Sequence, residues 1–289
     1  MILVIAGATG TGKSELAIEL AKRLDGEVIN ADAFQVYQEL SIATAKPSKE
    51  MREIVPHHLF DFVPLTEDYD VERYQKELRK ALDEVLSRNK VAIIAGGSGL
   101  YLRAALFDYS FSEQPRRIEE EKYAALNNEE LYQKLIAIDP EEAKKIHPNN
   151  RRRVLRAIEI YELEGRKKSE MIAEQKHAPI YDCRFFGLKP DRDSLYEKVE
   201  KRVDRMFEMG LVEEGTALIE KYGREPHAFQ AIGVKELFPY LDGASSLEDV
   251  KEEIKKNTRH YIKRQDTFFA HQFEIRWVEG IEEILEALS

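Results

Sequence analysis

The sequence predicts an α/β fold: a doubly wound, mostly parallel sheet with an inserted helical domain. Short apolar runs at Ile2–Ala6 and 91–95 each precede a glycine-rich turn, as central parallel strands do. Apolar residues at helical spacing follow both turns, at 14–24 and 100–106. This alternation is typical of doubly wound sheets. From about 111 to 180 the sequence is charge-rich and helical, which predicts the insertion.

The remaining elements continue this alternation. Val28 and Ile29 predict the end of a second strand, and residues 70–88 predict an amphipathic helix with one apolar stripe. After the insertion, the predicted elements are a strand at 184–188, helices over 195–265 and a last strand at Arg276–Val278. We therefore assign residues 1–110 and 181–289 to the α/β core, and residues 111–180 to the inserted helical module.

Composition limits the class of protein. The chain has 289 residues, 43% hydrophobic and 34% charged, so it can bury a core and is not disordered throughout. The longest nearly apolar stretch, 91–102, is shorter than the roughly 18 residues of a membrane span. The single cysteine, Cys183, excludes an internal disulfide. The N-terminal apolar run lacks the basic flank of a signal peptide. We expect a cytoplasmic, monomeric protein without membrane association.

Charge is unevenly distributed along the chain. The net charge of −10 argues against a surface coated with basic residues. Two segments are nevertheless basic and free of acids: residues 143–158 and 255–265. On a helix, Arg152, Arg153 and Arg156 would share one side and could bind phosphates of a nucleic acid. A solvated basic helix face is the alternative.

A phosphate-binding loop follows the first predicted strand and opens the first helix. Its residues are Gly7, Ala8, Thr9, Gly10, Thr11, Gly12, Lys13 and Ser14, which fit the pattern G-x-x-x-x-G-K-[ST]. Glycines let successive N–H groups point at phosphate oxygens, and Lys13 adds a full positive charge. The Ser14 hydroxyl is a candidate Mg²⁺ ligand. The motif predicts a P-loop NTPase-like fold that binds a diphosphate or triphosphate with Mg²⁺.

The acidic residues near this loop, including one that is missing, limit which reactions the loop could serve. The strand at 91–95 ends in glycines, without the Asp that usually holds the Mg²⁺ water shell in ATPases. This absence favours a loop that holds a diphosphate as a leaving group. Asp32 follows the second strand, so it should face the same crevice as the phosphate loop. It is either a helix cap or turn residue, or a functional residue of this crevice.

Motifs spread in order from residue 7 to residue 265 carry a resemblance to a known family. Besides the phosphate loop, they are DAFQVY at 32–37, IATAKP at 42–47, VPHHL at 55–59, GGSGLY at 96–101, IHPN at 146–149, QAIG at 230–233 and TRHYIKRQ at 258–265. The chain resembles the tRNA dimethylallyltransferases, also called tRNA isopentenyltransferases. The resemblance implies that it transfers a dimethylallyl group from dimethylallyl diphosphate to N6 of adenosine at tRNA position 37, releasing diphosphate. The partner would be a tRNA anticodon stem-loop with its target base flipped out.

The resemblance also implies roles for individual residues. Asp32 matches the general base, Ser98 a hydroxyl that bonds the diphosphate or the acceptor, and Arg259 a diphosphate clamp. The expected tRNA-binding residues are Asp32, Ala33, Phe34, Gln35, Ser98, Arg152, Arg153, Arg156, Lys263 and Arg264. Lys46 lies either near the site or on the surface. His57 and His58 are expected to pack near the core.

The chain departs from the family pattern at several positions. Ala33 stands where Ser is usual, Ala43 where Gly is usual and Val234 where Tyr is common. Residues 266–271, Asp-Thr-Phe-Phe-Ala-His, replace a common Thr-Trp-Phe-Arg and so remove an arginine. These changes bear on tRNA contacts more than on the transfer chemistry.

Two other functions remain open from the residues alone. A small-molecule or nucleotide kinase shares the phosphate loop, the α/β core and a helical lid, and it would turn over ATP. A non-catalytic nucleotide-dependent switch or RNA-binding factor would need no base at Asp32.

Overall fold

The predicted sheet is present and entirely parallel. A computed structural model describes residues 1–111, 120–175 and 178–289 of the chain. Their six-stranded sheet has the order β3-β2-β4-β1-β5-β6, and every described pairing is parallel. The strands are β1 (Ile2–Ala6), β2 (Gly26–Asn30), β3 (His57–His58), β4 (Val91–Gly96), β5 (Cys183–Leu188) and β6 (Arg276–Val278). The doubly wound α/β prediction is confirmed.

The predicted helices are present close to their expected positions, and two short helices, at 49–53 and 281–288, were not predicted. In the first part of the chain they are α1 (Lys13–Arg23), α2 (Lys49–Glu53), α3 (Val71–Ser87) and α4 (Gly99–Leu106). The predicted insertion contains η1 (Glu120–Tyr123), α5 (Asn128–Ile138), α6 (Pro140–Ala143), α7 (Arg151–Glu164) and α8 (Lys168–Glu174). The last part contains α9 (Arg192–Glu208), α10 (Leu211–Tyr222), η2 (His227–Gln230), η3 (Lys235–Leu237), α11 (Phe238–Leu241), α12 (Leu247–Gln272) and α13 (Ile281–Leu288). None of the described helices is both long and apolar enough to cross a membrane.

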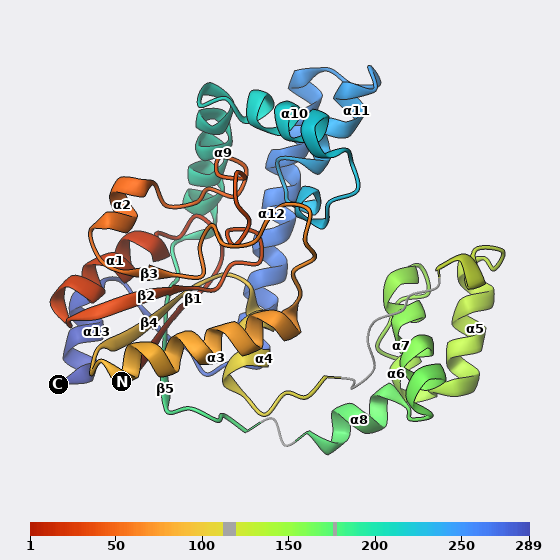
Figure 1. The fold of residues 1–289 in the computed structure, drawn as a ribbon, viewed down its shortest axis with the longest axis horizontal. Coiled ribbons are helices and arrows are strands. Elements are labelled where there is room, and N and C mark those ends of the chain that lie inside the picture. The colour runs from red at the N-terminus through yellow and green to blue at the C-terminus, as the bar shows by residue number, and fades with distance from the viewer. Residues whose placement is uncertain (112–119, 176–177) are drawn as a thin grey trace. The chain divides into compact units, whose positions relative to one another are not determined.

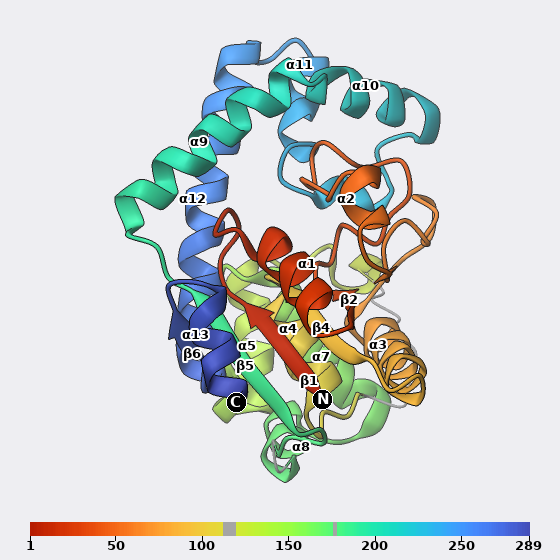
Figure 2. The same ribbon diagram turned by 90° about the vertical axis from the view of Figure 1, so that its left-hand side faces the viewer.

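Helices cover both faces of the sheet because its central strands are apolar on both sides. All five residues of β1 are buried. Leu3 and Ile5 pack with α1 and with Ile284 of α13 in one hydrophobic cluster. Side chains alternate along a strand, so Ile2 and Val4 point to the opposite face, which α3 and α4 cover (Figures 1 and 2). These helices cover the faces of the sheet, so they leave the carboxyl ends of its strands uncovered.

The chain divides into two compact units. One consists of Met1–Leu106 with Pro179–Ser289, and the other of Phe107–Ala178. The predicted module was 111–180, and its stretches 112–119 and 176–177 lie outside the described residues. The second unit has its own hydrophobic core, centred on residues such as Leu131, Leu135, Val154 and Ile158. Its helices therefore have a core that does not depend on the sheet.

The C-terminal helices bring side chains to the carboxyl edge of the sheet. α12 buries one stripe at helical spacing: Val250, Ile254, Thr258, Ile262, Gln265 and Phe269. From α9, Val199 packs with Ala8 and Ile262 in a small hydrophobic cluster. Figures 1 and 2 show α9, α10 and the first part of α12 beyond the strand ends. The phosphate loop thus lies between the sheet and these helices.

The two adjacent histidines form an edge strand rather than part of the core. His57 and His58 pair in parallel with β2, and both are half-buried. His58 Nε2 lies 2.6 Å from the buried Glu27 carboxylate, to which Arg88 also donates. His58 therefore belongs to a polar cluster at the sheet edge, whereas the His57 ring packs edge-on against Phe60 and bonds the Val55 carbonyl.

Close approach of two backbones makes Gly96 a sensitive position. A Cβ added at Gly96 would lie 2.1 Å from the Ala31 carbonyl oxygen. This oxygen belongs to the backbone, so it can move only if the backbone itself shifts. We expect Gly96→Ala to destabilise the core unit by about 1–3 kcal/mol. Denaturant unfolding, monitored through the fluorescence of Trp277, the only tryptophan, measures this loss of stability. The matched control is Gly280→Ala, where nothing lies within 4 Å. Equal midpoints for the two variants would contradict the prediction.

Candidate active site

The phosphate loop has the backbone geometry that its sequence requires. Gly7, Gly10 and Gly12 have φ values of 138°, 83° and 99°, a region that side-chain-bearing residues rarely adopt. Gly12 is also the N-cap of α1, so the helix begins directly at the loop. Gln265 of α12 accepts a hydrogen bond from Thr9 N–H at 2.9 Å and donates one to the Gly97 carbonyl at 2.9 Å. The loop is thus fixed from both the sheet side and the helix side.

Lys13 is buried beneath the loop. Its Nζ donates to the Ala8 carbonyl at 2.5 Å, so the ammonium folds back on its own loop. Burial lowers the pKa of Lys13 to about 8, although the nearby Asp32 carboxylate counteracts part of this shift. An anion on the loop would supply the negative charge that the buried ammonium lacks.

We therefore expect anion binding to depend on pH. As pH rises through about 8, free Lys13 loses its proton, whereas a bound diphosphate keeps it charged. The affinity for inorganic diphosphate should fall about tenfold between pH 7 and pH 9. Calorimetry across this range measures it. In the Lys13→Arg control the guanidinium stays charged, so this part of the pH dependence should vanish. The same decline in both proteins would contradict the assignment.

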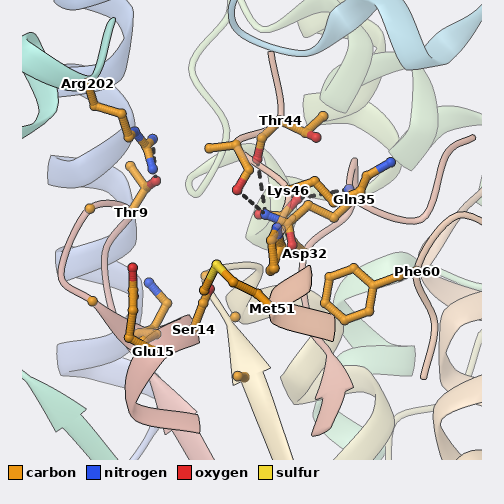
Figure 3. A pocket seen from close by; sticks show the side chains of 18 of the residues that line it. Thr9, Ser14, Glu15, Asp32, Gln35, Thr44, Lys46, Met51, Phe60 and Arg202 are labelled. Carbon is orange, nitrogen blue, oxygen red and sulfur yellow. Dashed lines mark hydrogen bonds between the residues drawn. The ribbon is translucent and has the colours of Figure 1, made fainter. Parts of the chain in front are cut away.

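A cavity of about 270 Å³, which we call the loop cavity, opens beside the phosphate loop (Figure 3). Cationic side chains near the phosphate loop line it: Lys13, Lys198, Arg202 and Arg205. Lys46 lines it too, with its side chain buried and paired with Asp61, so it lies near the site and not on the surface. Apolar side chains line another part of it: Val28, Met51 and Phe60. In Figure 3, Arg202 and Thr9 lie on one side of Asp32 and Phe60 lies on the other. The cavity combines an anion site with an apolar wall.

A second cavity of about 180 Å³, which we call the helix cavity, lies among α9, α12 and the 43–44 segment. Its apolar lining includes Phe34, Val203, Met206, Ile232 and Ile254. Its polar lining includes Gln230, Lys235, Thr258 and Arg264. Four residues line both cavities: Thr9, Asp32, Thr44 and Arg202. Asp32 is the only carboxylate among the described residues that line both.

The Asn30 side chain and two backbone N–H groups fix Asp32 at this junction. Asn30 accepts from Asp32 N–H at 3.0 Å and donates to the Asp32 carbonyl. The Asp32 carboxylate accepts from the N–H groups of Phe34 and Gln35. Burial raises the pKa of Asp32, while these two hydrogen bonds and the charges of Lys13 and Arg202 counteract the shift. A raised pKa makes this carboxylate a stronger base than an exposed one.

Ser98 and Gln35 lie near Asp32 but are engaged with the backbone. Ser98 Oγ accepts from Ala33 N–H at 3.0 Å, and Ser98 is not among the described residues that line either cavity. Gln35 lines the loop cavity, and its amide nitrogen donates to the Thr44 carbonyl at 3.0 Å. The structure thus places both side chains where they shape the Asp32 segment.

Arg202 occupies the position at which Arg259 was expected. Arg259 forms an ion pair with Glu200 and is not among the described residues that line the two cavities. Arg202 donates to Thr9 Oγ1 at 2.9 Å, and its Nε is buried without a hydrogen-bond partner among the described residues. A buried guanidinium with a spare donor beside the phosphate loop is suited to clamp an anion.

The sequence contains a pattern that points to Arg202. Lys198, Arg202 and Arg205 recur at helical spacing, so they form one basic stripe on α9. Acidic residues at 197, 200 and 204 hide this stripe in a count of charge along the chain. Reading the charges at helical spacing, rather than counting them along the chain, reveals this stripe.

The residues expected to bind RNA are spread over both units. Phe34 and Arg264 line the helix cavity, whereas Lys263 is exposed on α12. In the second unit, Arg152 and Arg153 are exposed on α7, and Arg156 pairs with Glu159 at 2.6 Å. The basic face on α7 therefore consists mainly of the first two arginines.

One of the departures from the family pattern, Ala43, lies beside the helix cavity. Ala43 lines that cavity, and a Cβ added at Gly233 would lie 3.2 Å from the Ala43 Cβ. The methyl group of Ala43 fits because residue 233 is a glycine. Val234 is fully buried, so its side chain acts in packing. Asp266 is half-buried on α12, and burial raises the pKa of its carboxyl.

The IPP transferase family profile matches residues 35–272. The chain belongs to this family. It is 41% identical to the tRNA dimethylallyltransferase of Anoxybacillus flavithermus over 285 residues, covering 98% of this chain and 92% of that protein. It is 40% identical to the Bacillus subtilis tRNA dimethylallyltransferase over 283 residues, covering 96% and 90%.

Solved structures of IPP transferase relatives share the fold. A eukaryotic dimethylallyltransferase acting on tRNA has a TM-score of 0.82 and 33% identity, covering 96% of this chain and 73% of that chain. The Staphylococcus epidermidis tRNA isopentenylpyrophosphate transferase has a TM-score of 0.73 and 36% identity, covering 99% and 96%. The family resemblance and the P-loop NTPase-like fold predicted from the sequence are confirmed.

Proposed function

We propose that this protein transfers a dimethylallyl group from dimethylallyl diphosphate to N6 of adenosine at position 37 of tRNA. The bond between the allylic carbon and the diphosphate oxygen breaks, and its electron pair leaves with the diphosphate. The adenine N6 lone pair forms the new C–N bond. The proton that N6 loses passes to the Asp32 carboxylate, so charge and atoms balance.

The position of Asp32 where the two cavities meet carries this proposal. The loop cavity offers the phosphate loop, Lys13 and Arg202 to a diphosphate, and an apolar wall to its prenyl group. The helix cavity offers Phe34 and other apolar side chains to a planar base, with polar groups for its edge. A nucleophile entering from one cavity and an allylic carbon from the other would meet beside Asp32.

The residues present also fit a magnesium ion. Mg²⁺ prefers oxygen ligands and is commonly held by one or two side chains together with substrate phosphates. Ser14 presents its hydroxyl to the loop cavity, and Glu15 lines the same cavity. The described residues contain no cluster of three His, Cys, Asp or Glu side chains that could hold a metal ion alone. Ser14 and the diphosphate would thus share the ion, which would neutralise the leaving group.

The anticodon stem-loop would be the RNA partner. Arg264 lines the helix cavity, where it can contact phosphates next to an extruded base. Arg152 and Arg153 give the second unit a basic face for the same polyanion. The cytoplasmic location and the monomeric state stay predictions from the sequence.

Mass spectrometry of a modified RNA tests the proposed function. The protein is incubated with Mg²⁺, dimethylallyl diphosphate and an anticodon stem-loop that has adenosine at position 37. We expect the RNA to gain one dimethylallyl group. A stem-loop with guanosine at position 37 lacks the N6 amine and should gain nothing. A stem-loop and a full-length tRNA that both stay unmodified would contradict the proposal.

The same experiment separates the proposal from the kinase alternative. Replacing dimethylallyl diphosphate with ATP should give no transfer to RNA. The relatives named above are tRNA-modifying transferases, which does not favour a kinase. Steady ATP consumption with a small acceptor, without RNA modification, would favour the kinase.

A further inference from the structure

The segment of residues 41–46 is surrounded by cavities. Ala43 and Thr44 line the helix cavity, Thr44 and Ala45 line the loop cavity, and Ser41 and Ile42 line a third cavity of about 560 Å³. Hydrogen bonds hold the segment at both ends: the buried Lys46 side chain donates to the Tyr37 carbonyl at 2.7 Å and pairs with Asp61, and Glu214 bonds the other end. Its position therefore depends on hydrogen bonds.

Glu214 of α10 supplies the hydrogen bonds on one side. Its carboxylate accepts from three consecutive backbone N–H groups: Ser41 at 2.9 Å, Ile42 at 2.9 Å and Ala43 at 3.1 Å. Successive N–H groups that converge on one anion form strong, charge-assisted bonds. A side chain 171 to 173 residues away in sequence thus fixes this segment.

On its other side, the same segment is bonded to the Asp32 region. Gln35 Nε2 donates to the carbonyls of Thr44 and Ala45 at 3.0 and 3.4 Å. Gln35 N–H in turn donates to the Asp32 carboxylate. A continuous set of hydrogen bonds therefore runs from Glu214 through the segment to the proposed general base.

We propose that Glu214 is a positioning residue for the acceptor. It holds residues 41–46 so that Thr44 stays at the junction of the two cavities and Gln35 stays against Asp32. This role rests on the proposed transfer to RNA. Glu214 makes none of these bonds to the phosphate loop, which Gln265 holds separately through Thr9 N–H. Diphosphate binding should therefore be independent of Glu214.

The experiment compares three properties of Glu214→Ala with those of the unsubstituted protein. We expect the KM for the anticodon stem-loop to rise at least tenfold. The amides of residues 41–43 should exchange with solvent at least tenfold faster, by hydrogen-exchange mass spectrometry. The dissociation constant for inorganic diphosphate with Mg²⁺ should change less than twofold. Glu214→Gln keeps one carbonyl acceptor, so it should give intermediate values.

Glu220→Gln is the matched control, because Glu220 is exposed on the same helix. It should change none of the three properties. Unchanged exchange at residues 41–43 in Glu214→Ala would overturn the proposal, and so would faster exchange with an unchanged KM for RNA. A parallel loss of diphosphate affinity would assign Glu214 a general structural role instead. An unsubstituted protein that modifies no RNA would contradict the proposed function, while amide exchange still tests the Glu214 contacts by themselves.

Discussion

Asp32→Asn is expected to lower the rate of prenyl transfer about 10²–10⁴-fold, the range typical for loss of a general base. The Asn carbonyl oxygen can still accept from the N–H groups of Phe34 and Gln35, so the backbone of the segment should keep its geometry. What is lost is the ability to take the proton from N6. Single-turnover kinetics with the stem-loop RNA measure the chemical step.

The pH profile adds a second criterion for Asp32. A base must be deprotonated, and burial raises the pKa of Asp32. In the unsubstituted protein, the transfer rate should therefore fall as pH drops through this raised pKa, and Asp32→Asn should lose that limb. The control is Asp83→Asn, an exposed aspartate on α3, which should transfer normally. A rate for Asp32→Asn within threefold of normal would make Asp32 an orienting residue only.

Arg202→Gln is expected to lower kcat/KM for dimethylallyl diphosphate at least 10²-fold. Glutamine keeps hydrogen-bonding capacity but removes the charge that stabilises the departing diphosphate. The effect should exceed that of an ordinary surface charge because the guanidinium is buried beside Thr9. Steady-state kinetics with dimethylallyl diphosphate varied at saturating RNA provide the measurement.

Arg259→Gln is the informative comparison for Arg202. Arg259 was the expected diphosphate clamp, but its guanidinium pairs with Glu200. We expect kcat/KM for dimethylallyl diphosphate to change less than threefold in Arg259→Gln. The reverse ranking, with Arg259→Gln the more impaired, would restore the role implied by the family resemblance and contradict the role given to Arg202.

Local sequence signals predicted the elements well where one physical cause dominates. β1 and β4 are apolar throughout because they are covered on both faces, so periodicity was not needed to find them. The phosphate loop needs only backbone freedom and one lysine within eight residues. Its motif could therefore be recognised without reference to distant residues. β3 was missed because two polar residues carry no strand signal, and its pairing with β2 is tertiary.

The site was predicted less completely because most of it comes from separate elements. The general-base candidate, Asp32, lies directly after a strand, and position along the sheet edge was enough to place it. Arg202 and Gln265 reach the phosphate loop from α9 and α12, more than 190 residues away in sequence. Helical spacing groups Arg202 with other basic residues of α9, but no local pattern reports which distant element they contact.

The sequence by itself determined the parallel α/β core, the phosphate loop, the acid beside it and the family. These features depend on short-range patterns: apolar runs, glycines at positive φ, and motif spacing. Only the tertiary structure decided that Asp32 lies where two cavities meet, that Arg202 rather than Arg259 faces the loop, and that Glu214 holds residues 41–46. The physical reason is that burial and hydrogen-bond partners depend on which distant helices pack over the sheet edge.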